Sequence, residues 1–233
     1  MIDLQQFATY QAARAGFRWP SPKTFNIAHV CAGAFAEREP ARTAIILADE
    51  RGKPRPVSYG TLDEMVSRCA NALAHLGIGR GDRVAIHLGQ RLETVVVHLA
   101  VYRLAAVAVP LAAVFGSEAI TYRMDHAGAS LIVTSGEGAA RLPELDATVV
   151  TADPGSTGHD LHALMGKASA TRSTAVTGPD DPAMMIFTSG TTGQPKGALH
   201  GHRVLLGHLP GVVMHHELLP HPGDRLWTPA DWA

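Results

Sequence analysis

The hydrophobic positions of this chain follow helical and strand-like patterns in turn. Apolar residues recur every three or four positions from Thr61 to Leu76, which predicts an amphipathic helix that ends at Gly77. Either Ser58 or Thr61 could cap its start, since both side chains can accept a hydrogen bond from the first backbone N–H groups. The short apolar run Val84–Leu88 that follows is typical of a buried strand.

The same alternation continues downstream and predicts the fold class. We expect a helix over Glu93–Leu104, a strand over Ala105–Val109, a helix from Ser117 to near Gly128 and a strand over Ser130–Thr134. Strands that alternate with crossover helices pair in parallel. The predicted fold is therefore α/β, with mostly parallel sheets flanked by helices.

Composition divides the chain into three segments. Residues 1–150 are expected to form a first α/β subdomain with an N-terminal extension. Residues 151–182 are rich in Gly, Ser, Thr, Asp and Pro, which predicts an exposed connection around one apolar patch, Leu161–Met165. Residues 183–233 begin a second α/β unit. Because two of the three tryptophans lie at 227 and 232, we expect this unit to be truncated.

Overall composition excludes several classes of protein. With 46% hydrophobic and 18% charged residues, the chain is expected to be globular. Its 20 basic and 21 acidic residues give no general attraction to nucleic acid. Cys31 and Cys69 are too few for a disulfide scaffold, so we expect reduced thiols and a cytoplasmic protein. The apolar stretch Val95–Phe115 contains Arg103, so no membrane span is predicted, and no secretory signal is visible at the N-terminus.

The segment after Ala183–Phe187 carries the most chemical information. This compact apolar strand leads into Thr188-Ser189-Gly190-Thr191-Thr192-Gly193-Gln194-Pro195-Lys196-Gly197, in which two glycines, four hydroxyl side chains and one of only four lysines precede Gly197. Glycines allow backbone N–H groups to converge on an anion, hydroxyls add donors, and a lysine supplies positive charge. These are the parts of a polyphosphate-binding loop.

Composition alone leaves other interpretations of this segment open. A glycine- and threonine-rich turn is a plain structural turn about half the time, and neither the Walker pattern nor the dinucleotide pattern fits here. Six of the 13 histidines lie between His200 and His221, but they lack zinc-ligand spacing, so no metal site is predicted. A serine hydrolase is disfavoured because no GxSxG elbow is present.

The spacing of Ile186–Gly197 resembles, position for position, the signature loop of the adenylate-forming (AMP-binding) enzymes, which include acyl-CoA synthetases, luciferases and peptide-synthetase adenylation domains. The resemblance extends roughly from Phe25 to the end of the chain through Val57–Leu62, Gly81–Ile86, Val107–Leu111 and the helix up to Gly128-Ala129. Three segments look most like the acetyl-CoA and medium-chain acyl-CoA synthetase branch: Phe25–Ala28, Leu111–Gly116 and Trp227–Trp232. Phe187 stands where many members have tyrosine.

The resemblance implies the N-terminal part of the family's large domain and an ATP-dependent acyl-CoA synthetase of fatty acid metabolism. Such an enzyme joins a carboxylic acid to ATP, releases pyrophosphate, and transfers the acyl group to CoA, with Mg²⁺ as cofactor. The resemblance also implies that the loop hydroxyls bind the β- and γ-phosphates and that the two glycines let the loop fold over these phosphates. It further implies that Lys196, as the catalytic residue, offsets the charge of the leaving group. The residues concerned are Thr188, Ser189, Gly190, Thr191, Thr192, Gly193 and Lys196. His202 and Asp231 would lie near the acyl group.

Family members are more than twice this long, and several of their expected segments have no counterpart before Ala233. These are the acidic residue that assists Mg²⁺, the aspartate on the ribose, the hinge and the small domain with its lysine. Alternatives therefore stay open: a stand-alone phosphate- or nucleotide-binding module, an inert scaffold, or a peptide-synthetase-type adenylation domain. An apolar face left without its neighbour predicts self-association, as in a homodimer.

Overall fold

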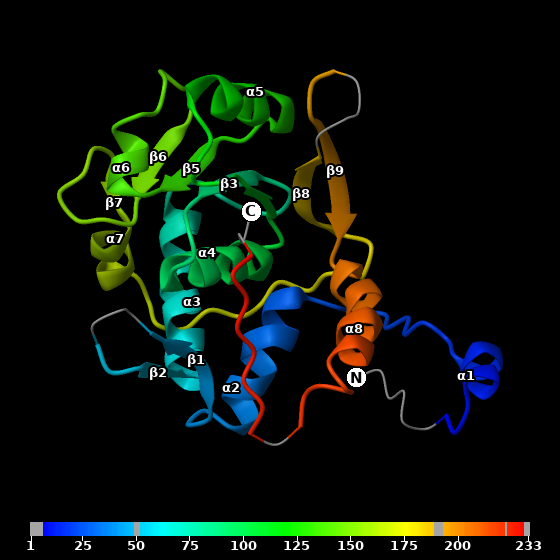
Figure 1. Ribbon diagram of the computed structural model, residues 1–233. Helices are drawn as coiled ribbons and strands as arrows, with labels where there is room; N and C mark the ends of the chain where they lie inside the picture. The colour runs from blue at the N-terminus through cyan, green and yellow to red at the C-terminus, as the bar shows by residue number, and fades with distance from the viewer. Residues whose placement is uncertain (1–6, 49–51, 189–192, 222, 231–233) are drawn as a thin grey trace.

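A seven-stranded sheet forms the centre of the computed structural model, which describes residues 7–48, 52–188, 193–221 and 223–230 (Figure 1). The strand order is β7-β6-β5-β3-β4-β8-β9, and all neighbours are parallel except the antiparallel pair β8 and β9. The strands are β3 (Arg83–His87), β4 (Val107–Pro110), β5 (Leu131–Thr134), β6 (Thr148–Thr151), β7 (His159–Asp160), β8 (Pro182–Thr188) and β9 (Lys196–Gly201). The predicted α/β fold with a mostly parallel sheet is thus confirmed.

Helices cover both faces of the sheet, as Figure 1 shows. On one face, α3 (Tyr59–His75), α4 (Leu92–Arg103) and α7 (Leu161–Lys167) pack against a core that includes Val84 and Ile86 of β3. On the other face, α5 (Ser117–Ala127) packs against Ala85. Successive residues of a strand point to opposite faces, and both faces are buried here, which explains why the central residues Val84, Ala85 and Ile86 of β3 are all apolar.

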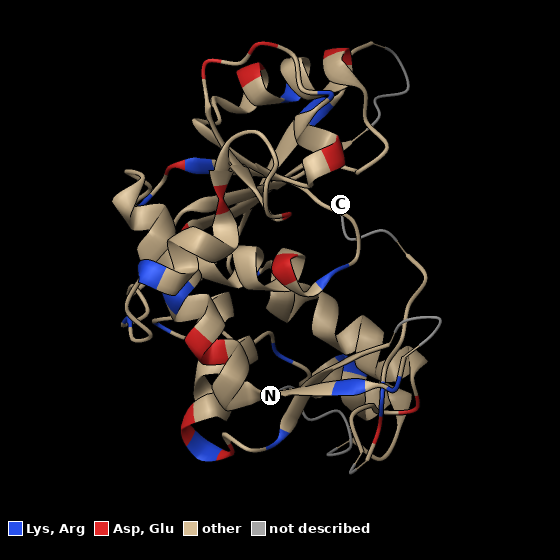
Figure 2. Ribbon diagram, turned by 90° about the vertical axis from the view of Figure 1, so that its left-hand side faces the viewer, with Lys and Arg blue, Asp and Glu red and all other residues tan. Residues whose placement is uncertain are grey.

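The remaining elements lie outside these layers. Helix α1 (Tyr10–Gly16), the π-helical turn η1 (His29–Gly33) and α2 (Ala34–Arg38) precede an antiparallel hairpin, β1 (Thr43–Leu47) and β2 (Arg55–Ser58), which forms a sheet of its own. Helix α6 (Gly136–Ala139) follows β5, and α8 (Val204–His215) follows β9. Figure 2 shows that basic and acidic residues are interspersed over the molecule as a whole.

The ends of α3 decide between the two predicted caps. The Ser58 hydroxyl accepts a hydrogen bond from the Thr61 N–H at 3.2 Å, so Ser58 is the cap and the helix begins two residues before Thr61. At the other end, Gly77 has φ +92°, a conformation that favours glycine and stops the helix.

Strand β4 begins later than predicted. Ala105 has φ +56° and its N–H donates to the Tyr102 carbonyl, while the Ala106 N–H donates to Val101. These bonds close the end of α4, so the strand starts only at Val107 rather than at Ala105. The apolar sequence alone could not separate a helix-ending turn from the start of a strand.

The segment expected to be an exposed connection contains ordered elements. It includes β7 and α7, whose Leu161 and Met165 are buried. Beyond α7, Asn71 of α3 donates to the carbonyls of Ser169 and Thr171 at 2.9 and 3.1 Å. Strands β8 and β9 then extend the same sheet. The division into subdomains at residues 150 and 182 stays a prediction.

Within the part of the chain that is described, no helix combines the length and the hydrophobicity that crossing a bilayer requires.

Candidate phosphate-binding site

The predicted phosphate loop connects two antiparallel strands. Thr188 at the end of β8 lies opposite Lys196 at the start of β9, and Phe187 lies opposite Gly197. The sheet thus holds the two ends of the loop side by side. Of the predicted site residues, the structure describes Thr188, Gly193 and Lys196. The other four lie outside the described residues, namely Ser189, Gly190, Thr191 and Thr192.

The described loop residues have the properties that an anion site needs. Thr188 and Lys196 are exposed, so a hydroxyl and an ammonium group face solvent on neighbouring strands. Gly193 has φ +102°, and a Cβ placed there would meet nothing within 4 Å. Glycine is therefore favoured at 193 by backbone conformation and not by lack of space.

Glycine at 197 has a different cause. A Cβ there would lie 2.8 Å from the Met185 Sδ and 3.4 Å from the Phe187 Cζ. Both side chains belong to β8 and fill the space beside Gly197 of β9 where a Cβ would lie. The glycine that follows Lys196 thus allows β8 side chains to pack over the foot of the loop, by which we mean the paired strand ends Phe187–Thr188 and Lys196–Gly197.

Helix α5 supports this foot through a set of side chains that we call the hairpin-support cluster: Phe115, Tyr122, Arg123, His126 and Phe187. The rings of Tyr122 and His126 stack with centroids 5.7 Å apart, and both meet the Phe187 ring edge to face. The Arg123 guanidinium lies 4.2 Å from the centre of the Phe115 ring. Packing of this kind uses the Phe187 ring and needs no hydroxyl, which explains why phenylalanine serves at this position.

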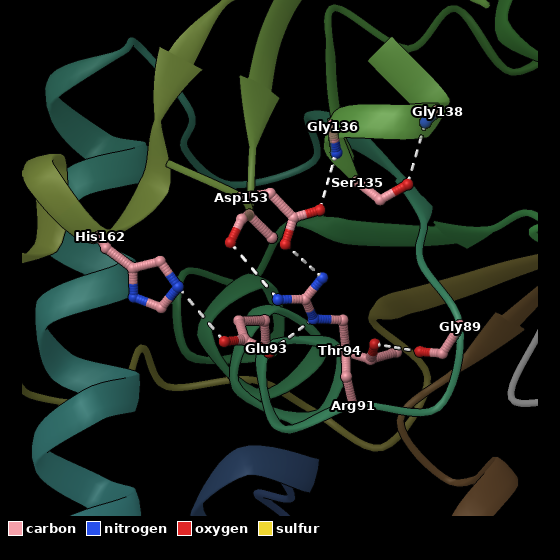
Figure 3. Close-up of polar contacts among 10 residues, drawn as sticks. Gly89, Arg91, Glu93, Thr94, Ser135, Gly136, Gly138, Asp153 and His162 are labelled. Carbon is pink, nitrogen blue, oxygen red and sulfur yellow. Dashed lines mark hydrogen bonds and ion pairs between the residues drawn. The ribbon is translucent and has the colours of Figure 1, made fainter. Parts of the chain in front are cut away.

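A polar network that the sequence interpretation missed lies at the carboxyl edge of the sheet (Figure 3). Arg91 contacts Glu93 at 2.7 Å and Asp153 at 2.8 Å, and Asp153 also accepts from the Gly136 N–H at 2.8 Å. The His162 Nε2 lies 3.2 Å from Glu93. The network joins the start of α4 to the end of β6 and to α6 and α7.

The acidic members of this network are held in their charged form. The Gly136 N–H and then Arg91 lower the pKa of Asp153. Burial, the largest single influence, would raise the pKa of Glu93, but the hydrogen bond and charge of Arg91 together with the hydrogen bond from the Glu93 N–H lower it overall. Because these side chains satisfy one another, we interpret the network as structural. The sequence signal for it was weak: an aspartate shortly after an apolar strand.

His202 is a buried structural residue in this chain. Its side chain is fully buried, and its Nδ1 lies 3.2 Å from the Ile27 N–H, which donates to it. Burial lowers the pKa of His202 to about 4.

The described residues do not bring together three or more histidine, cysteine or acidic side chains that could hold a metal ion. Asp231, predicted to border an acyl pocket, lies outside the described residues.

The low pKa of His202 predicts a loss of stability on acidification. As the pH falls from about 6.5 toward about 4, the unfolded state takes up the proton first, so the native state loses stability across this window. In His202→Asn, the amide oxygen can still accept a hydrogen bond from the Ile27 N–H. Between about pH 7.5 and about pH 5, the free energy of unfolding of this variant is expected to fall by about 2 kcal/mol less than that of wild type. Urea denaturation at both pH values measures this. His208→Asn, on the exposed side of α8, is the control, and equal pH dependence in all three proteins would contradict the prediction.

Comparison with known proteins identifies the class to which this fold and loop belong. The family model for AMP-binding enzymes matches residues 33–233, so the chain belongs to the AMP-binding enzyme family. It is 32% identical over 252 residues to an acetyl-coenzyme A synthetase of Escherichia coli O6:H1, and the match covers 96% of this chain but 38% of that protein. An acetyl-coenzyme A synthetase of Streptomyces avermitilis is 32% identical over 207 residues, covering 78% of this chain and 32% of the relative.

Solved structures agree with this assignment. An acyl-CoA synthetase from Brucella canis superposes with a TM-score of 0.85 at 27% identity, covering 97% of this chain and 43% of that one. The N-terminal subdomain of Klebsiella oxytoca NpsA gives a TM-score of 0.65 at 26% identity, covering 79% of this chain and 44% of that one. The chain thus spans less than half the length of these relatives.

Proposed function

We propose that this chain carries the phosphate-binding part of an ATP-dependent acyl-CoA synthetase. The reaction would join a carboxylate to ATP, giving an acyl-adenylate and pyrophosphate, and then transfer the acyl group to CoA. The observation that carries the proposal is the antiparallel pairing of Thr188 with Lys196, which brings the two ends of the glycine- and threonine-rich segment together on adjacent strands. Membership of the AMP-binding family supports it.

The chemistry explains what the loop residues would contribute. Two anions must meet when a carboxylate attacks the α-phosphorus, so charge neutralisation and in-line positioning dominate the barrier. Hydroxyls of Thr188, Ser189, Thr191 and Thr192 would bind the β- and γ-phosphates, and Gly190 and Gly193 would let the backbone approach. Lys196 would offset the charge that develops on pyrophosphate. No residue of the loop acts as a covalent nucleophile in this scheme.

Mg²⁺ would accompany the triphosphate, since this ion is usually bound through substrate phosphates together with one or two carboxylates. The residues that the structure describes do not form a cluster of metal ligands.

The final acceptor of the acyl group distinguishes two versions of this function. The acetyl-coenzyme A synthetase relatives favour CoA. The NpsA neighbours, one of which is an artificially fused adenylation–PCP di-domain, keep a peptide-synthetase-type adenylation domain as the alternative. A stand-alone nucleotide-binding module is the second alternative, since the chain spans 38% of the first of these relatives.

Calorimetry with Mg-ATP, followed by a pyrophosphate-exchange assay with acetate, tests the proposal. Binding together with exchange supports a synthetase. Binding without exchange favours the stand-alone module, and the absence of any binding contradicts a phosphate site.

We also propose that the protein works in the cytoplasm, on the evidence of its two cysteines. The thiols of Cys31 and Cys69 are free, and burial raises the pKa of Cys69 to about 12, which is in keeping with an unreactive thiol and a reducing, cytoplasmic environment.

We also propose that β9 and α8 mediate a homodimer. Strand β9 is the last strand of the sheet, and Leu199 and Met214 expose 55% and 64% of their surface on these elements. Light scattering is expected to show concentration-dependent dimers that Leu199→Lys weakens. A monodisperse monomer at all concentrations would contradict the dimer.

A further inference from the structure

One hydrogen bond joins helix α5 to the foot of the phosphate loop. The Tyr122 hydroxyl donates to the Pro195 carbonyl at 2.9 Å, between residues 73 positions apart in the chain. Pro195 immediately precedes Lys196, the first residue of β9. The contact therefore lies at the point where the loop re-enters the sheet.

The position of this bond bears directly on Lys196. The carbonyl of Pro195 and the N–H of Lys196 belong to one planar peptide unit, so fixing the direction of the carbonyl also fixes that of the N–H. On the other side, the ladder between Thr188 and Lys196 holds the same residue. Lys196 is thus constrained by the sheet and by the helix together.

The tyrosine itself is well placed to act as an anchor. It is half-buried in the hairpin-support cluster, stacked on His126 with an interplanar angle of 17° and set against the Phe187 ring at 71°. A ring held on two sides loses little further entropy when its hydroxyl makes a hydrogen bond. The cluster thereby preorganises the hydroxyl toward Pro195.

We propose that Tyr122 is a positioning residue for the phosphate loop: its hydroxyl holds the Pro195 peptide and so orients Lys196 toward the triphosphate. This inference rests on the proposed function of the loop. Tyr122 itself is not a catalytic residue, because it acts through Pro195.

Tyr122→Phe tests the inference with the smallest possible change, since it removes the hydroxyl and retains the ring contacts. The loss of one hydrogen bond is expected to weaken Mg-ATP binding by about three- to ten-fold in calorimetry. Amide hydrogen exchange over residues 193–199 is expected to become faster, while the thermal midpoint stays close to that of wild type.

Tyr102→Phe is the matched control. Its hydroxyl also contacts strand β8, at the Met184 Sδ 3.5 Å away, but near the end of the strand that lies away from the loop. ATP affinity and exchange over 193–199 should therefore be unchanged in this variant.

The outcomes separate the inference from the proposed function. Unchanged exchange over 193–199 in Tyr122→Phe would overturn the anchor, whatever the protein binds. Faster exchange with unchanged ATP affinity would overturn the positioning role. If wild type binds no Mg-ATP, the proposed function fails, and the exchange measurement alone decides whether Tyr122 anchors the loop.

Discussion

Replacing Lys196 by alanine is expected to abolish measurable Mg-ATP binding by this chain. In a protein extended to the full length of its relatives, it should lower pyrophosphate exchange by about 10²-fold or more, which is the typical contribution of one preorganised charge contact. Lys196 is exposed and lies opposite Thr188, so under the proposed function its ammonium group would contact the phosphates together with the Thr188 hydroxyl. It is also the only lysine in a loop that otherwise offers neutral donors.

Two variants make this experiment specific. Lys167→Ala removes another lysine, at the end of α7, and should leave ATP binding unchanged. Lys196→Arg keeps the charge but changes the shape and hydration of the cation, so partial activity is expected. Exchange near the wild-type rate in Lys196→Ala would remove this residue from the mechanism.

Asp63→Ala is expected to destabilise the fold by about 3 kcal/mol, because it leaves a buried guanidinium without its counter-charge. Arg103 of α4 is only 2% exposed. Its guanidinium donates to the Asp63 carboxylate and, at 2.6 Å, to the Ser67 hydroxyl, both on α3. The pair therefore joins the two helices that cover one face of the sheet.

Urea denaturation measures this loss, and the next residue provides the control. Glu64 forms an exposed ion pair with Arg68 at 3.0 Å, one turn along α3. Glu64→Ala is expected to cost about 0.5 kcal/mol, as exposed pairs on a helix do. The double variant Asp63→Ala/Arg103→Met should recover much of the stability, since no unpaired charge is left buried. Equal losses in Asp63→Ala and Glu64→Ala would contradict this account.

The sequence predicted the elements whose signals are local. Helix α3 was recognisable from its apolar period and from Ser58 and Gly77 at its ends. Helix α5 ends where Gly128 takes φ +61°, as the pattern indicated. Strands β3, β5 and β8 appeared as compact apolar runs. In each case the information lies within consecutive residues, because helix caps and strand alternation depend on neighbours along the chain.

Other elements have no such local signal. Strand β9 contains two glycines, at 197 and 201, and alone resembles a turn more than a strand. It becomes a strand because β8 supplies a ladder of hydrogen-bonding partners from Pro182 to Thr188. The start of β4 was misplaced for the opposite reason, since Ala105 is apolar but takes the helix-ending conformation.

At the candidate site too, some features follow from local sequence and others only from tertiary contacts. The spacing of residues 186–197 was enough to identify the family, which the match over residues 33–233 confirmed. The pairing of Tyr122 with Pro195 could not be predicted, and neither could the burial of Arg103, which appeared in the sequence only as a charge that argued against a membrane span.

The sequence by itself therefore determined the α/β class, the family and the chemical character of the loop, because periodicity and motif spacing are properties of adjacent residues. The tertiary structure alone decided what supports the loop and where Arg103 and His202 find their partners. These contacts join residues 40 to 175 positions apart. They exist only once the packing of helices on the sheet has compensated the entropy of bringing such distant segments together.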